Sequence, residues 1–127
     1  MNWKSVGTLK VFALLLLMAC AACTSLPPAQ VATDTKAIVG KWDGYILLRG
    51  TGNNAATLQF FDDGRFVGSV AGWPESRGTV KVVDGKYRMH SETRNVGSTL
   101  TLHGDGGERV LTILTDDGHS GQYRPAK

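Results

Sequence analysis

The sequence predicts an all-β fold: a small eight-stranded antiparallel up-and-down β-barrel that follows a signal peptide and a flexible tether. Asp-Gly pairs recur at residues 63–64, 84–85, 105–106 and 117–118. This pair is a strong hairpin signal when it separates apolar runs. Between the pairs, apolar and polar residues alternate, which is the period of a half-buried strand. No convincing helical period appears after residue 38.

Alternation defines eight expected strands, in chain order: 40–49, 55–61, 65–70, 77–83, 86–92, 98–103, 108–115 and 119–124. In the first strand, Trp42 and Ile46 share one face. Tyr45 and Leu47 lie on the opposite face, where they form a small apolar patch beside Arg49. That patch either stays on the surface or packs against the tether.

Most of the other strands place a pair of apolar residues on the inward face: Leu58 and Phe60, Phe66 and Val70, Val80 and Val82, Tyr87 and Met89, Leu100 and Leu102. Their outward positions are mainly Thr, Lys, Arg and Gln. The strand at 108–115 is ambiguous, because Val110 and Leu114 oppose Leu111 and Ile113. It is a candidate for burial on both faces.

Closure of the eight strands into a barrel is expected because an open sheet would expose two edges and an apolar face. Eight strands enclose an interior just wide enough for side chains or one small ligand. A membrane-spanning barrel does not fit, since it needs an apolar outer band on strands of about 9–11 residues.

Residues 1–19 have the features of a secretory signal peptide. Lys4 and Lys10 give a positive start, and the apolar run over residues 11–19 follows it. The run is too short to span a bilayer as a helix, which takes about 20 residues, and it has the length of a signal-peptide core.

The run ends in Leu17-Met18-Ala19-Cys20, which resembles the lipobox of bacterial lipoproteins. The resemblance implies cleavage before Cys20, lipidation of its thiol with palmitate-like acyl chains, and attachment to the outer membrane on its periplasmic side. Cys23 is the alternative site. A disulfide between the two cysteines would be strained, and no nearby side chains complete a metal site. An ordinary secreted protein with an incidental cysteine is the remaining alternative.

Residues 20–37 are rich in small residues and contain Pro27-Pro28, so we expect a flexible tether that carries the lipidated N-terminus. The barrel domain is expected over residues 38–125. Without residues 1–19, the basic residues fall from 14 to 12 against 11 acidic ones, and the net charge is +1. Such a balance gives no indication of a nucleic-acid partner.

The stretch Val39–Tyr45, "VGKWDGY", resembles the G-x-W start of lipocalin and calycin barrels, with Gly40 and Trp42 at the matching positions. The resemblance implies that the Trp closes one end of the barrel and packs against an arginine near the last strand. Arg124 is in position to be that arginine, through a cation–π contact.

No catalytic, metal or cofactor motif is visible. The adjacent aspartates fall in expected turns, and His90, His103 and His119 lack metal-ligand spacing, so we expect exposed or turn-flanking histidines. Ser120 beside His119 lacks a nucleophile elbow, and no glycine-rich phosphate loop precedes a helix. We therefore expect no enzymatic activity, no metal and no cofactor.

Two binding hypotheses remain. In the first, the barrel mouth holds a small apolar ligand or lipid, which needs a cavity of about 300 Å³ or more. In the second, loops contact an envelope protein, as in an assembly factor or a peptidase inhibitor. Trp73, in the polar loop at 71–78, is a candidate hot spot or a lid over the barrel, and Tyr45 is a second candidate contact.

Overall fold

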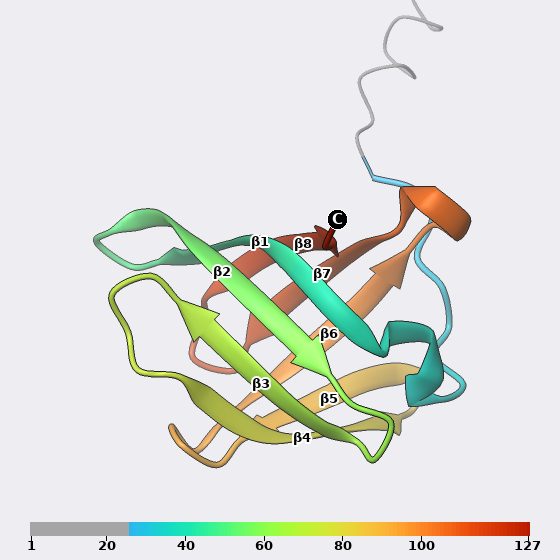
Figure 1. Cartoon of the computed structure of the whole chain (residues 1–127), viewed down its shortest axis with the longest axis horizontal. Helices are drawn as coiled ribbons and strands as arrows, with labels where there is room; N and C mark the ends of the chain where they lie inside the picture. Colours follow the sequence, from blue (N-terminus) through green and yellow to red (C-terminus); the bar gives the residue numbers. More distant parts are fainter. Residues whose placement is uncertain (1–25) are drawn as a thin grey trace, which may run out of the picture.

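The computed structural model describes residues 26–127 and shows a closed barrel (Figure 1). Each strand pairs antiparallel with the next, and the last pairs with the first, so the predicted up-and-down barrel is confirmed. The strands are β1 Gly40–Leu48, β2 Gly52–Phe60, β3 Arg65–Val70, β4 Ser76–Val83, β5 Lys86–Ser91, β6 Val96–His103, β7 Val110–Thr115 and β8 Ser120–Pro125. Two 3-10 helices flank them: η1 Thr35–Ile38 and η2 Gly106–Glu108.

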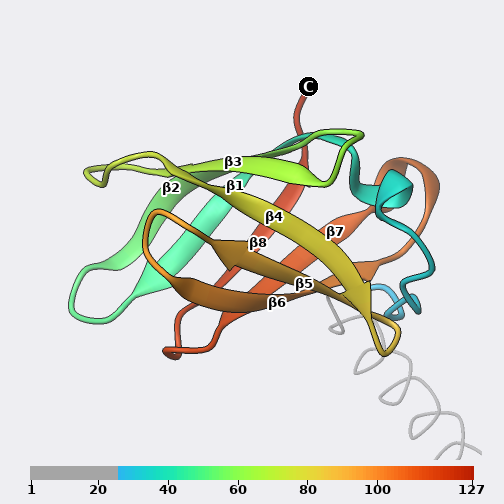
Figure 2. The same ribbon diagram turned by 90° about the horizontal axis from the view of Figure 1, so that it is seen from below.

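The two ends of the barrel differ. Figures 1 and 2 show the β1–β2, β3–β4, β5–β6 and β7–β8 loops at one end, and η1 and η2 at the other. The tightest turn, at the η1 end, is the two-residue Asp84-Gly85 hairpin between β4 and β5. Both residues have positive φ, 52° and 75°, as a type I′ turn requires. The other three Asp-Gly pairs lie in longer connections.

The inward residues form one core, and the predicted alternation accounts for it. All ten inward residues expected for the intermediate strands are in the core cluster or pack against it. The ambiguous strand, β7, resolves in favour of Leu111 and Ile113, which are buried, while Leu114 is exposed. The expectation of burial on both faces therefore fails at Leu114, although Val110 is buried as well.

The η1 end is closed by the chain that precedes β1. Ile38 is fully buried, and its carbonyl accepts a hydrogen bond from Trp42 Nε1 at 2.9 Å. Farther back, Gln30 N donates to Leu102 O and Ala32 N donates to Gly85 O, both at 2.8 Å. Part of the expected tether over residues 20–37 is thus bonded to the barrel, because its backbone pairs with free groups at strand ends.

The cation over Trp42 is Arg109, 5.3 Å from the ring centroid, and not Arg124. The Arg124 assignment is corrected by strand parity. Tyr123 is buried inside the barrel, so its neighbour Arg124 is on the outer face, opposite Asp43 in the register. Arg109 lies just before β7, at the end that Trp42 closes.

The predicted signal peptide at 1–19 and both candidate lipidation sites, Cys20 and Cys23, lie outside the described residues. Within residues 26–127, no helix has the length and apolar character needed to cross a bilayer.

Candidate functional site

A cavity of about 90 Å³ opens into the barrel at the end opposite η1. Its walls come from all eight strands and are mainly apolar. The lining residues are Ile46, Leu48, Thr57, Leu58, Phe66, Gly68, Ser69, Val70, Ser76, Met89, Ser91, Arg94, Val96, Ser98, Thr115, Asp117, His119 and Tyr123. The cavity is well below the 300 Å³ expected for a whole ligand.

The cavity exists because the inward residues become smaller toward the open end. In one layer of the register, Tyr87, Leu100 and Ile113 are paired neighbours and fill the interior. One step nearer the open end, Met89 pairs with Ser98 and Ser98 with Thr115. These shorter side chains do not meet across the barrel, so space remains between them.

Two serines at the open end stabilise the wall rather than present free hydroxyls. Ser76 Oγ and Ser91 Oγ are 2.5 Å apart and share a hydrogen bond. Ser91 Oγ also accepts a hydrogen bond from Arg94 N at 3.2 Å. This pair joins β4 to β5 and fixes the start of the β5–β6 loop.

His119 is the functional candidate that the sequence reasoning missed. It lines the cavity, and its Nδ1 is buried without a hydrogen-bond partner among residues 26–127. The other ring nitrogen, Nε2, is 3.6 Å from Asp117 Oδ2. Its backbone N–H donates to Thr115 Oγ1 at 2.7 Å, which fixes the loop that carries the ring. A buried imidazole nitrogen with no protein partner is suited to hydrogen bonding with a ligand.

Tyr123 is an uncharged part of the cavity wall, which also includes the charged residues Arg94 and Asp117. It is buried, and this burial raises the pKa of its phenol to about 12. Burial disfavours the charged phenolate, so the side chain is uncharged at neutral pH. Met89 and Leu58 also line the cavity, and together with this neutral phenol they favour an apolar group against their part of the wall.

The rim of the cavity carries Trp73 and Arg94. Trp73 is 50% exposed, and the guanidinium carbon of Arg94 lies 4.8 Å from its ring centroid. Arg94 also lines the cavity, so it connects the exposed indole with the barrel mouth. On the same loop, Arg77 Nη2 is 2.8 Å from Glu75 Oε1. Trp73 thus lies at the rim and does not line the cavity as a lid.

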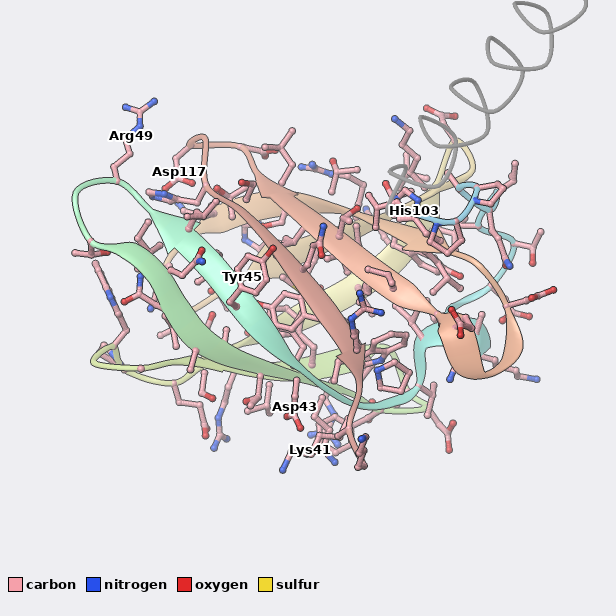
Figure 3. The ribbon with its side chains drawn as sticks, turned by 90° about the horizontal axis from the view of Figure 1, so that it is seen from above. Lys41, Asp43, Tyr45, Arg49, His103 and Asp117 are labelled. Carbon is pink, nitrogen blue, oxygen red and sulfur yellow. The ribbon has the colours of Figure 1, made fainter. Side chains whose placement is uncertain are left out.

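The structure does not bring Tyr45 and Trp73 together. Tyr45 lies on the outer wall of the barrel (Figure 3), where it lines a separate groove with Leu47 and Leu114. The predicted patch of Tyr45 and Leu47 is therefore exposed and is not covered by residues 26–37.

The remaining sequence candidates are dispersed. His90 is exposed, while His103 is hydrogen-bonded through both ring nitrogens, to Pro27 O at 3.1 Å and to Thr112 Oγ1 at 3.2 Å. Ser120 is exposed on the outer wall. Over the part of the chain that the structure describes, no three His, Cys, Asp or Glu side chains gather as metal ligands would.

Comparison with family models, with curated proteins and with solved structures finds no match to this chain.

Proposed function

We propose that this protein is a lipoprotein of the bacterial outer membrane, anchored through lipidated Cys20 and facing the periplasm, and that its barrel is a binding module for a small apolar ligand or lipid. The lipobox-like sequence before Cys20 supports the anchor. The lipocalin-like start at Gly40 and Trp42, together with the closed eight-stranded barrel, is consistent with a binding fold. The observation that carries the binding role is the mainly apolar cavity at the open end.

The size of the cavity limits what part of a ligand enters it. At about 90 Å³, it is smaller than the ~150 Å³ engineered cavity that holds a benzene ring. We infer that a ligand inserts only one end, such as the terminus of an acyl chain, and leaves the remainder at the rim near Arg94. Polar groups that line the cavity include His119, whose Nδ1 has no hydrogen-bond partner among the described residues, and the hydroxyl-bearing Ser98 and Tyr123.

Binding is tested with the Cys20→Ser chain and three six-carbon probes that differ only in their polar group: hexanol, hexanoate and hexylamine. We expect NMR shift changes at the Met89 methyl and at Ile46, both of which line the cavity. The cavity lining holds one cation, Arg94, and one carboxylate, Asp117, so neither hexanoate nor hexylamine has an unopposed partner, and we expect the neutral hexanol to bind best.

A matched pair of variants locates the binding. Ser98→Leu fills the cavity and abolishes the shift changes, whereas Thr99→Leu, on the opposite face of the same strand, leaves them unchanged. The proposed binding role is contradicted if the probes cause no NMR shift change at Met89. It is also contradicted if the shift changes in Ser98→Leu are as large as in the wild-type protein.

Trp73 supports a second candidate, a protein-interaction module such as an envelope assembly factor or a peptidase inhibitor. A half-exposed Trp stacked with an Arg is typical of interface hot spots. Trp73→Ala is then expected to lose an envelope partner in a pull-down, while Tyr45→Ala, on the outer wall, retains it. If Trp73→Ala captures every partner of the wild-type protein, the second candidate fails.

A further inference from the structure

Three apolar side chains form a patch on the outer wall of the barrel. Tyr45 and Leu47 of β1 and Leu114 of β7 are 37%, 45% and 58% exposed. The register places them around Ser120 of β8, which is paired with Leu47 on one side and with Leu114 on the other. We call these three residues the wall patch. The groove along it is lined by uncharged residues except for Lys86.

The described chain begins on the side of the barrel that carries the wall patch. Pro27 O is bonded to His103 Nδ1, and His103 Nε2 is 3.2 Å from Thr112 Oγ1. Thr112 lines the groove together with Tyr45. Figure 3 shows His103 and Tyr45 on the same outer face.

The attachment point cannot move far from this position along the barrel. Gly104 N donates to Pro28 O at 3.0 Å, and the hydrogen bonds of Gln30 and Ala32 continue the attachment. Residues 27–32 therefore add no free length between the barrel and an anchor on Cys20.

Covalent geometry then limits the distance between the barrel and the bilayer. Five residues, 21–25, lie between the proposed lipidated Cys20 and Leu26, so the two Cα atoms are at most about 20 Å apart when the chain is fully extended. Thr112 and Leu114 are two residues apart on β7, or about 7 Å along the strand. The wall patch is thus within reach of the surface that holds the acyl chains.

We propose that the wall patch is the membrane-facing surface of the barrel, which rests on the bilayer with Tyr45, Leu47 and Leu114 at the level of the lipid headgroups. This inference rests on the proposed lipid anchor. A short linker gives a tethered surface an effective concentration on the order of millimolar. A weak contact is therefore enough to fix the orientation. Tyrosine favours this interface, because its ring is apolar and its hydroxyl is polar.

The other surfaces fit a bilayer less well. On the outer face of β3, β4 and β5, Arg65, Arg77 and Arg88 are already paired with carboxylates, so little of their positive charge is left to attract lipid. Their partners are Asp63, Glu75 and Asp116. The η1 end carries the carboxylates of Asp62, Asp63, Asp84, Asp105 and Glu108, which an anionic lipid surface repels and which Lys36 and Lys86 offset only in part. Lys86, which borders the wall patch, is attracted to such a surface.

This orientation has a consequence for the binding site. Because a side wall faces the bilayer and the cavity opens at one end of the barrel, the mouth with Trp73 opens along the membrane plane. A ligand that leaves the periplasmic leaflet or a neighbouring envelope protein therefore approaches the mouth from the side.

The test uses the lipidated mature chain in vesicles of phosphatidylethanolamine and phosphatidylglycerol. A Cys23→Ala background carries one added cysteine with a nitroxide label, either Ser120→Cys in the centre of the wall patch or Thr79→Cys on β4. Both are exposed, small polar residues in strands. Electron paramagnetic resonance measures label collisions with oxygen, which is enriched in lipid, and with a water-borne nickel chelate.

We expect the ratio of oxygen to nickel collisions to be several-fold higher at position 120 than at position 79. Changing Leu47→Gln and Leu114→Gln together is expected to remove this difference, while Val83→Gln, at an exposed aliphatic position on β4, is not. A glycine–serine insertion of about 20 residues after Ser25 is expected to reduce the ratio, since it lowers the effective concentration.

Equal ratios at positions 120 and 79 in a lipidated protein overturn the proposed orientation and leave the anchor intact. A low rate of nickel collisions at position 120 in the unlipidated Cys20→Ser chain without vesicles also overturns the orientation, because a second copy of the chain would then cover the wall patch. Intact mass separates these results from failure of the anchor, since a chain without added acyl mass refutes the anchor itself and this inference with it.

Discussion

Arg109 lies over the ring of Trp42, 5.3 Å from its centroid, and its Nη1 donates to Ala37 O at 2.8 Å. One side chain thus connects η1 to the Trp that closes the barrel. Trp42 makes the second link itself, through its hydrogen bond to Ile38 O. These contacts add to the backbone hydrogen bonds of Gln30 and Ala32, which hold the segment before β1 at the closed end.

Arg109→Ala is expected to lower the free energy of unfolding by about 1–2 kcal/mol, through loss of one cation–π contact and one hydrogen bond. Arg124→Ala, on the outer face, is expected to change it by less than about 0.5 kcal/mol. Urea unfolding followed by Trp42 fluorescence measures both. If Arg124→Ala loses more free energy of unfolding than Arg109→Ala does, Arg124 is the arginine that packs against Trp42, as the sequence predicts.

The stability of the barrel is expected to fall at high pH because of Tyr123. Burial raises the pKa of this phenol to about 12, against about 10 in an unfolded chain. Its contribution is complete below pH 10 and is lost as the pH rises from 10 to 12, by about 1.4 kcal/mol per pH unit.

Tyr123→Phe removes this dependence, so we expect the variant to gain about 1 kcal/mol relative to wild type between pH 7 and pH 11. Other titrating groups, including Tyr87, whose pKa is also raised by burial, cancel in the difference between the two proteins. Urea unfolding at the two pH values gives the comparison, and parallel losses of stability would contradict a buried neutral phenol.

Gly97 lies directly against an ion pair on the outer wall. Arg88 Nη1 and Nη2 donate to Asp116 Oδ1 and Oδ2 at 3.0 and 2.9 Å. A Cβ on Gly97 would lie 2.5 Å from Asp116 Oδ2 and 2.6 Å from Arg88 Nη2. Gly97→Ala therefore separates the two side chains.

Side-chain hydrogen bonds from Arg88 are the main cause of the lowered pKa of Asp116. In Gly97→Ala we expect the pKa of Asp116 to rise toward its usual value, as it also does in Arg88→Ala. The stability that this carboxylate contributes is present above its unfolded pKa and is lost as the pH falls through its folded pKa. NMR titration of Asp116 measures the shift, and an unchanged pKa in Gly97→Ala would show that the pair adapts to the added methyl group.

The fold could be predicted because its signals are local. The alternation around Val80 and Val82 and the Asp84-Gly85 turn between two strands act over a few residues, and closure follows from the cost of open edges. The attachment of residues 27–32 could not be predicted, because single backbone hydrogen bonds to distant strand ends leave no pattern in the sequence.

The cavity was also beyond prediction, for a different reason. It depends on which inward residues share a layer, and the pairing of Met89 with Ser98 and of Ser98 with Thr115 is a property of the inter-strand register. His119 did have a signal. It is two and four residues before Gly121 and Tyr123, so strand alternation places all three on the inner face.

His119 is expected to lower stability in the unliganded protein. Its Nδ1 is buried without a partner among the described residues, and an unsatisfied buried polar atom costs about 1–3 kcal/mol. His119→Phe keeps a ring of similar shape and removes the nitrogen. We expect this variant to be more stable than wild type by about 1 kcal/mol and to bind hexanol more weakly, because the hydroxyl of the probe loses its partner.

His90→Phe is the control, since His90 is exposed and lies outside the cavity. Its stability is expected to stay within about 0.5 kcal/mol of wild type, with hexanol affinity unchanged. Urea unfolding and NMR titration measure the two properties. A less stable His119→Phe that binds hexanol as wild type does would show that the imidazole supports the fold and does not contact the ligand. Higher stability together with weaker hexanol binding in His119→Phe is expected only where a side chain is kept for binding at the expense of stability.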